Sequence, residues 1–542
     1  MGLHESSRAR IAGIILLLAG AVFASSAAHR ANAASLPQPI VRIELEPLGY
    51  QGLQAEFLLA GSPMLTVDFV DQTHLLVTFE VHRLLTREAD AGPREQDRVI
   101  LAWLLELPSG KVLSRAEWRM HDRGQYLWNL GSGRFMLRIR DELMVFAPLA
   151  GRPDDAFRTS GLLMTDRRLL GVGVSANNDL LTIASEKRSQ PAAGTADAHP
   201  PADPTPIQFN FYRLKVDASD GTLLRAGSAG AIRTPNPVAL PLTTAGYLDA
   251  LQTGKNTWGF NFDEYNGKVN ELPAFDSTCF PRAVFVDHSE FVAFACRGGT
   301  ERRTLAAFNL RGEEMWQQGF YESYVAPVFS FAPAAGRFAL SRVIVPLPMA
   351  ENERLNGDLA KSQEIRVYQT YTGQQLFHID CSPVERAGQN FALSADGLRL
   401  AVVREVAVRR KATRDSAAYT ANSTGIEIYA LPGLSTQDES AVKAATLAAP
   451  PDTDAAIDVL LARIAAAKSR GEGRETAAPP ASRPTPPPSI KPPAAAVSPA
   501  ASAATPAGPP SAAEPAAEQD ESPQEPRKPP TLYEPGDSPQ SR

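Results

Sequence analysis

The sequence is poor in the residues that build metal and redox sites. It has three cysteines and eight histidines in 542 residues, and they form no H-E-x-x-H, C-x-x-C or C-x-x-C-H pattern. Such patterns hold zinc, carry redox chemistry or attach haem, so their absence excludes the commonest sites of these kinds. A G-x-S-x-G nucleophile elbow is missing as well. The motifs therefore predict no catalytic residue, no metal site and no cofactor.

The few cysteines also exclude a fold held together by several disulfides. A two-residue turn at His288-Ser289 would place Cys296 opposite Pro281, with Cys279 diagonal to Cys296 on the same face. These two thiols are near enough for a bridge if the strands twist together there. Two separate buried thiols are the alternative, and Cys381 is left unpaired in either case.

The N-terminus has the layout of a secretory signal peptide. Arg8 and Arg10 precede the apolar run of residues 11–24, and Ala31-Asn32-Ala33 fits an A-x-A cleavage site. We expect residues 1–33 to be removed, which leaves a secreted or periplasmic protein without a transmembrane segment. A retained membrane anchor is the alternative. No cysteine follows the run, so nothing there offers itself for lipid attachment. Export and a net charge of −6 argue against nucleic acid as a partner.

The C-terminal region changes composition after about residue 445. Of the 45 prolines, 21 lie beyond residue 449, and aromatic residues nearly vanish. Such a segment cannot bury enough apolar surface to offset the entropy of ordering it, so we predict a disordered tail over residues 471–542. Within the linker of residues 437–470, the apolar residues from Ile457 to Ile464 follow a helical period and predict a short amphipathic helix. This helix would dock on the main domain or bind a partner.

Between these ends, residues 38–436 consist of strand-like runs separated by turn residues, without a long helical pattern. A strand-turn-strand unit such as FALSADGLRLAVVREV (residues 391–406) occurs seven times, and the copy from Leu240 to Leu251 fits worst. A second series of strand-turn-strand units alternates with the first. Its turn glycines are Gly110, Gly151, Gly221, Gly267, Gly312, Gly373 and Gly433. Two alternating series, with a repeat length slightly above ~40 to 45 residues, predict an all-β, seven-bladed propeller of four-stranded antiparallel blades.

Ring closure should involve both ends of this domain. After Gly433 the seventh unit lacks a good outermost strand, and STQDESAVKAATLAA would be a poor one. Residues Ile40 to Glu46 alternate apolar and charged side chains, as a half-exposed strand does. We predict that they supply the missing strand, which would also remove an exposed sheet edge.

The hairpin S-A-D-G-L-R-L-A-V-V followed by I-E-I-Y-A-L resembles the YVTN and WD40-like seven-bladed propellers, in their degenerate bacterial form. The resemblance covers roughly residues 40–435. The turns TGQQLF and RGEEMW are also similar to quinoprotein-type repeats, in which an aromatic residue docks one blade on the next. Only Trp316 and Phe377 match that position, and the WD dipeptide of regular WD40 repeats is absent.

Four blades carry long insertions between their second and third strands, and these connections emerge on one rim of a propeller. Insertions there can be tolerated without a function, but their concentration on one face favours a recognition surface. The last insertion contains a basic cluster that we consider the candidate binding surface for a protein or an anionic cell-envelope component. The cluster consists of Arg404, Arg409, Arg410, Lys411 and Arg414.

The sequence thus favours an exported, monomeric, noncatalytic propeller that binds a protein or a cell-envelope component through the face with the long loops. The alternative is a propeller enzyme, lactonase-like or quinoprotein-like, with a site at the mouth of the central channel. A third possibility is a scaffold in an envelope complex, with the tail as a tether. Fold analogy alone cannot choose among them.

Overall fold

The structure is a computed structural model. It describes sixteen stretches of the chain. They are residues 37–50, 65–81, 83, 85–86, 88, 97–121, 124–187, 207–216, 224–234, 242–278, 280–295, 303–320, 327–344, 362–381, 389–410 and 419–450. The predicted signal peptide, the helix expected around residues 457–464, the tail, Cys279 and Cys296 lie outside them. The described helices include none that is long and apolar enough to span a membrane.

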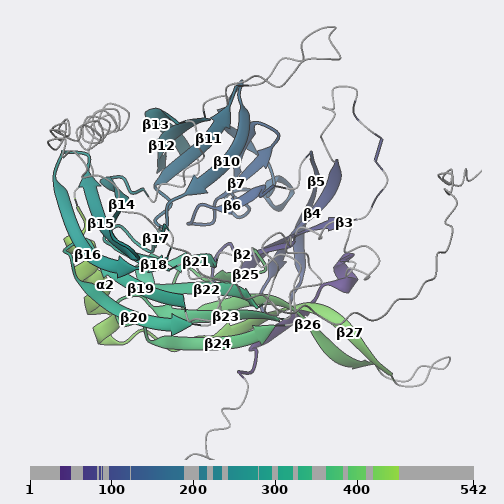
Figure 1. The fold of residues 1–542 in the computed structure, drawn as a ribbon. Coiled ribbons are helices and arrows are strands. Elements are labelled where there is room, and N and C mark those ends of the chain that lie inside the picture. The colour runs from purple at the N-terminus through teal and green to yellow at the C-terminus, as the bar shows by residue number, and fades with distance from the viewer. Residues whose placement is uncertain are drawn as a thin grey trace, which may run out of the picture. The chain divides into compact units, whose positions relative to one another are not determined.

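Seven antiparallel sheets surround a common centre, as Figure 1 shows, and we number these blades in chain order. Blade 1 contains β2 (Leu65–Phe69), β3 (His74–Val81), β4 (Arg98–Glu106) and β5 (Val112–Met120); blade 2 contains β6 (Leu127–Asn129), β7 (Phe135–Ile139), β8 (Glu142–Phe146) and β9 (Ser160–Met164). Blade 3 contains β10 (Arg168–Val174), β11 (Leu180–Glu186), β12 (Ile207–Val216) and β13 (Leu224–Thr234); blade 4 contains β14 (Gly246–Gly254), β15 (Thr257–Glu264) and β16 (Val269–Asp276). Blade 5 contains β17 (Arg282–Phe285), β18 (Glu290–Phe294), β19 (Arg303–Asn309) and β20 (Glu314–Phe320); blade 6 contains β21 (Val328–Ala332), β22 (Arg337–Ile344), β23 (Ser362–Gln369) and β24 (Gln375–Cys381). Blade 7 contains β25 (Phe391–Leu393), β26 (Arg399–Arg410), β27 (Tyr419–Ala430) and β1 (Val41–Glu44). The predicted seven-bladed propeller is confirmed.

One backbone hydrogen bond recurs from blade to blade and shows that the blades are copies of one unit. The amide at or just after the end of the third strand donates to a carbonyl of the first hairpin turn, as from Leu107 to Thr73 in blade 1 (2.7 Å). The same bond joins Leu431 to Leu398 in blade 7 (2.8 Å) and Tyr265 to Ala245 in blade 4 (2.9 Å). Both tight turns of a blade therefore lie at one end of the strands, which we call the turn face. The connections between second and third strands lie at the opposite end, the loop face.

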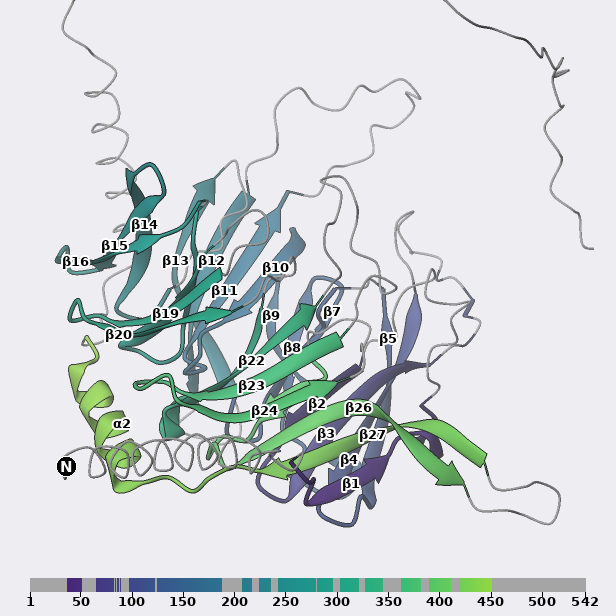
Figure 2. The same cartoon turned by 60° about the horizontal axis from the view of Figure 1, so that its bottom comes forward.

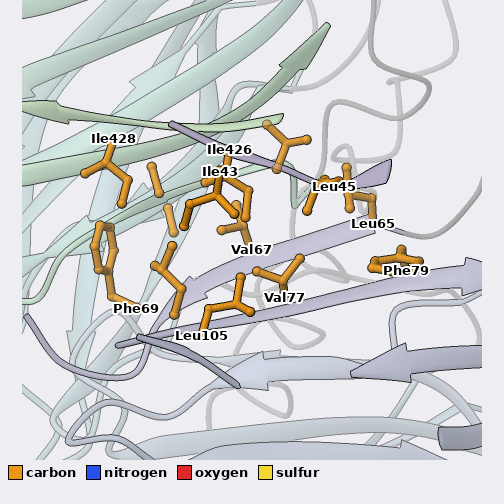
Figure 3. Packing of buried hydrophobic residues seen from close by; sticks show 14 of the residues in the cluster. Ile43, Leu45, Leu65, Val67, Phe69, Val77, Phe79, Leu105, Ile426 and Ile428 are labelled. Atoms are coloured by element: carbon orange, nitrogen blue, oxygen red, sulfur yellow. The ribbon is translucent and has the colours of Figure 1, made fainter. Parts of the chain in front are cut away.

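The N-terminal strand closes the ring as predicted. Strand β1 pairs antiparallel with β27, with Ile43 opposite Ile426, and forms the outer edge of blade 7. Ile43 is buried among apolar side chains of blades 1 and 7, and Figure 3 shows this cluster. Next to it, Arg42 donates to Glu427 (2.7 Å) across 385 residues of sequence. Apolar burial and an ion pair thus hold the two ends of the domain together.

Blade 4 departs from the pattern at its inner edge. The described residues before β14 contribute only an isolated bridge between Leu242 and Tyr247. The sequence just before this bridge, residues 235–241, reads PNPVALP, and proline cannot donate a backbone hydrogen bond to a neighbouring strand. The poor fit of this copy to the sequence repeat reflects the same composition.

The hairpin turns of blades 3 and 5 meet directly across blade 4. His288 Nε2 lies 2.5 Å from Asp179 Oδ2, and Ser175 Oγ donates to the other carboxylate oxygen of Asp179 (2.6 Å). Burial acts to raise the pKa of Asp179, but hydrogen bonds from His288 and Ser175 outweigh it and hold the pKa below its usual value. A polar contact therefore joins two blades that are not neighbours in the ring.

A helix follows the last blade where the sequence reading placed a linker. Helix α2 (Thr436–Ala448) begins with a capping box, in which Asp438 N donates to Ser435 Oγ (3.1 Å) and Ser435 N donates to Asp438 Oδ2 (2.7 Å). The helix was missed because its apolar pattern is weak, although S-T-Q-D is a capping signal. The capping box stabilises the first turn of α2 by hydrogen-bonding backbone amides that would otherwise lack an acceptor, and the helix does not depend on a broad apolar face.

Contacts with blades 5 and 6 dock α2 on the turn face (Figure 2). Ser289 Oγ donates to the carbonyl of Ala445 (3.0 Å), and Tyr371 OH donates to Asp438 Oδ1 (2.7 Å). The approach is close, because a Cβ atom on Gly336 would come within 2.8 Å of Val442. Gly336 also has a positive φ of 58°, which favours glycine.

Candidate functional site

The inner strands enclose a cavity of about 1270 Å³ along the centre of the ring. Blades 1, 2, 3, 6 and 7 contribute its walls, mainly through their first strands and first hairpin turns, with Tyr50 and the second turn of blade 2 in addition. The volume exceeds the ~300 to 1,000 Å³ typical of pockets for small ligands. Five hairpin turns border it, so the turn face forms one mouth of the cavity.

A carboxyl group lies on the wall between blades 1 and 2. Strand β2 turns Leu65, Val67 and Phe69 toward the core shared with blade 7, and strand alternation places Asp68 on the opposite side, with Thr66. Removal from water raises the pKa of Asp68 to about 7, and a hydrogen bond from Asn129 acts against this rise. Asp68 therefore changes charge near neutral pH.

Hydroxyl groups fill the same interblade seam beside Asp68. Thr66 and Thr78 share a hydrogen bond of 2.7 Å, and Thr78 shares another of 2.5 Å with Tyr126 OH. Burial raises the pKa of Tyr126, so this phenol stays protonated in the physiological range. The seam is polar: it presents hydroxyl groups, and the charges of Arg98 and Glu80 also act on Tyr126.

Hydrogen bonds join the turns of blades 1 and 7 at the turn-face mouth. Gln72 Nε2 donates to Asp396 Oδ2 (2.9 Å), and Arg399 donates to the carbonyl of Gln72. The carboxylate of Asp71 accepts from Thr73 N and lies 2.9 Å from His74 Nδ1. Although burial acts to raise the pKa of Asp71, these bonds hold it below its usual value. Both carboxylates thus accept hydrogen bonds that stabilise the turns at the cavity mouth.

The structure separates Arg404 from the other residues of the candidate basic cluster. Arg404 lies in β26, where its guanidinium is 3.4 Å from Glu427 Oε2 and donates to Tyr429 OH (3.3 Å). Arg404 thus shares the carboxylate of Glu427 with Arg42 inside blade 7. Arg409 and Arg410 belong to the last residues of β26, while Lys411 and Arg414 lie outside the described residues. The role of these four residues in binding stays a prediction.

The strand boundaries place all four insertions on the loop face. The insertions join β3 to β4, β11 to β12, β22 to β23 and β26 to β27. In blade 7 the insertion is mainly an extended hairpin, because β26 and β27 pair as far as Arg410 and Tyr419. In blade 1, the described residue Glu88 pairs with Arg119 (3.3 Å) and with Arg140 of blade 2 (2.8 Å). Ion pairs therefore fix part of the first insertion against its blade.

One group of side chains in blade 6 has the spacing of metal ligands. Glu364, His378 and Asp380 offer ligand atoms that all lie within 4.8 Å of one another. Glu364 is buried and already pairs with Arg342 and Arg366. Burial acts to raise the pKa of Glu364, but the two guanidinium groups outweigh it and lower the pKa. Two cations beside the carboxylate disfavour a third, so we interpret the group as an ion-pair network.

The described cysteine is not a candidate nucleophile. Cys381 is buried and unbonded, and burial raises the pKa of its thiol to about 12. A thiol with this pKa carries almost no thiolate at neutral pH. Because Cys279 and Cys296 lie outside the described residues, the disulfide between them stays a prediction.

Sequence reasoning missed Asp68 and its partner Asn129, since neither belongs to a recognised motif. The available signal was the stretch TVDF, in which a carboxylate interrupts the apolar run of an innermost strand. An innermost strand borders the channel, so a charged residue in it indicates a candidate site even without a motif.

No protein-family model and no curated protein sequence matches the chain. Among solved structures, it is similar to an acylaminoacyl peptidase of Pyrococcus horikoshii, with 10% identity over 69% of this chain and 53% of the peptidase and a TM-score of 0.35. It is also similar to an oligogalacturonate lyase in complex with manganese (10% identity, 68% and 97% coverage, TM-score 0.32). A third similar structure is a putative TolB from Agrobacterium tumefaciens (10% identity, 62% and 99% coverage, TM-score 0.28). The chain spans about half the length of the peptidases, and such distant likenesses give no information on activity.

Proposed function

We propose that the protein is an exported, noncatalytic propeller that binds a protein or a cell-envelope component through its loop face. The observation that carries this proposal is the position of the four insertions, which all follow second strands and therefore share one end of the ring. Extended connections on a rigid scaffold are where binding residues concentrate. The signal-peptide pattern supports export.

The composition of the channel wall supports a noncatalytic role. The described residues that line the cavity include Asp68, Asp71 and Asp396 but no histidine, cysteine or lysine. Asp71 and Asp396 are engaged in turn hydrogen bonds. General acid–base catalysis needs a second group within hydrogen-bond reach of the substrate, and these carboxylates already have structural partners.

A capture experiment with the full chain tests the loop-face proposal. The variant Arg409→Ser, Arg410→Ser, Lys411→Ser and Arg414→Ser removes the basic residues of the last insertion. The control replaces four exposed basic residues elsewhere by serine, namely Arg152, Arg158, Lys255 and Arg282. We expect at least tenfold weaker saturable capture of one envelope component by the first variant and unchanged capture by the control. Equal capture by both variants, or no saturable capture by the wild type, would contradict the proposal.

The second candidate is an enzyme with its site in the channel, and the near-neutral pKa of Asp68 is the observation that favours it. A carboxyl that titrates near pH 7 can both accept and donate a proton. Lactone hydrolysis by the wild type, lost at least a hundredfold in Asp68→Asn, would replace the noncatalytic proposal. Absence of turnover in both proteins would leave binding as the function.

A further inference from the structure

Asp68 faces the cavity with few groups to compensate its charge. Its hydrogen-bond partner Asn129 is held by backbone atoms of both blades, because its Nδ2 donates to Phe69 O (3.2 Å) and its Oδ1 accepts from Gly131 N (2.9 Å). A carboxylate has about four acceptor sites, and a single carboxamide cannot fill them. A cation brought in from outside would stabilise a partly buried carboxylate in this position.

The other charged groups on the cavity wall leave it negative. Asp71 and Asp396 stand at the turn-face mouth, and Arg134 is the one basic residue among the described lining residues. Three carboxylates against one guanidinium attract cations when Asp68 is ionised. Asp71 and Asp396 also lie on the path from the mouth, where they would guide a cation inward.

Aromatic rings line the same cavity. Phe329 and Phe331 of β21 stack with their ring centroids 5.9 Å apart and an interplanar angle of 6°, and Trp128 of β6 also borders the cavity. Aromatic faces and edges bury the carbon chain of a ligand, and the faces also attract cations. The channel therefore combines carboxylates with aromatic surface.

We propose that the channel binds a small organic cation, with an ammonium or guanidinium group paired to Asp68 and an aliphatic part against the aromatic side chains. The site is separate from the loop face, and nothing in its chemistry requires the loop-face partner. The cavity is large enough for a flexible diamine or an alkylguanidine.

Binding of such a cation must release a proton from the fraction of molecules in which Asp68 is protonated. A neighbouring positive charge favours the ionised carboxyl, so the pKa of Asp68, about 7 in the free protein, falls on binding. The affinity is then highest above pH 7 and decreases as the pH falls through 7. Between pH 8 and pH 6 the expected loss is about tenfold, and at pH 7 about half a proton is released per bound cation. Asp71, Asp396 and Arg134 are the other charged groups facing the cavity, and of these the pKa of Asp71 is already depressed.

Calorimetry on the full chain tests the proposal with 1,5-diaminopentane and agmatine as probes and pentane-1,5-diol as the uncharged control. The variant Asp68→Asn keeps the size of the side chain, and Asp166→Asn removes an equal charge from an exposed position. We expect saturable binding of at least one cation, about tenfold tighter at pH 8 than at pH 6. Asp68→Asn should bind at least tenfold more weakly and without pH dependence, and Asp166→Asn should bind as the wild type does.

Proton release by the wild type gives an independent readout if Asp68→Asn fails to fold. The binding enthalpies measured at pH 7 in two buffers should differ by about half the difference between the ionisation enthalpies of the buffers, because the buffer takes up about half a proton per bound cation. The proposal is overturned by equal binding of the diol, by unchanged cation binding in Asp68→Asn, by binding without proton release, or by no saturable binding of either cation.

Discussion

Within the described residues, blades 7 and 4 differ from the other blades, each at a different edge of its sheet. In blade 7 the missing outer strand comes from the N-terminus, which pairs with β27 along its whole length. In blade 4, within the described residues, the inner edge is marked only by the Leu242–Tyr247 bridge, and the turns of blades 3 and 5 approach each other through His288 and Asp179.

The comparison shows that the two edges are held by different kinds of interaction: apolar burial at the outer edge of blade 7 and a polar contact beside the inner edge of blade 4. An outer strand joins the ends of the ring and buries apolar side chains from two blades, so closure depends on it. The first strands bury apolar side chains as well, as Leu65, Val67 and Phe69 of β2 show, and in five blades they line the cavity. In blade 4 a polar contact between the two adjacent blades, His288 with Asp179, lies at the turn face, and three changes compare the two blades.

The largest effect is expected when a charge is placed in the closing strand. Ile43→Asp would bury a carboxylate among apolar residues of blades 1 and 7, at a cost of about 4 kcal/mol or more. We expect loss of the cooperative unfolding transition, measured by urea denaturation. The comparison in blade 4 is Leu251→Asp in β14, the strand that follows the irregular inner edge, at a position that is 40% exposed whereas Ile43 is 7% exposed. It should alter the free energy of unfolding by less than about 0.5 kcal/mol. Similar losses in both variants would refute the distinction between the blades.

We expect an intermediate loss of stability when the buried carboxylate of blade 7 is replaced by an uncharged group. Glu427 pairs with Arg42 (2.7 Å) and Arg404 (3.4 Å), so Glu427→Gln leaves two guanidinium groups without their counter-ion. We expect a loss of about 2 to 3 kcal/mol in the free energy of unfolding. Glu264 of blade 4 is equally buried, but its partners are nearby residues, namely Asn266, Asn270 and the exposed Lys268 (3.3 Å). Glu264→Gln should therefore cost about 1 kcal/mol, and a greater loss there than in Glu427→Gln would reverse the interpretation.

The smallest effect concerns the contact across blade 4. The pKa of Asp179 is lowered in the folded protein, so its stabilisation is complete above the unfolded pKa of about 3.9 and is lost as the pH falls through the folded value. Because both side chains are about one-third exposed, we expect Asp179→Asn to cost only about 0.5 to 1 kcal/mol at pH 6. The deficit should shrink as the pH falls below about 3.9 and through the lower pKa of the folded protein. A deficit that is constant between pH 6 and pH 3 would show that the carboxylate charge does not matter.

The repeat pattern was sufficient to predict the fold because hairpin turns and strand alternation are local properties. The turn at Gly397 and a strand from Ile40 to Glu46 were predicted from the sequence. The structure has the turn there, and the strand covers Val41–Glu44, whereas Glu46 begins a short 3-10 helix. In both cases the backbone conformation or the burial pattern follows from adjacent residues.

The contacts that join distant segments could not be read in this way. The pairing of Arg404 with Glu427 depends on a strand register, and the pairing of Asp179 with His288 spans 109 residues. The channel position of Asp68 required the ring to be assembled first. Helix α2 was missed for another reason, since its capping signal was present in the sequence and was not used.

The closing strand has a consequence for the order of assembly. Val41–Glu44 is among the first described segments to be synthesised, yet its partner β27 comes almost 400 residues later. Contacts of such high sequence separation form slowly, because a long chain must be ordered before they yield free energy. A chain that stops before β27 leaves β1 without its partner, so the open edge distinguishes incomplete chains from finished ones. Proteases and chaperones that recognise extended, unpaired strands would therefore act selectively on unfinished copies of this protein.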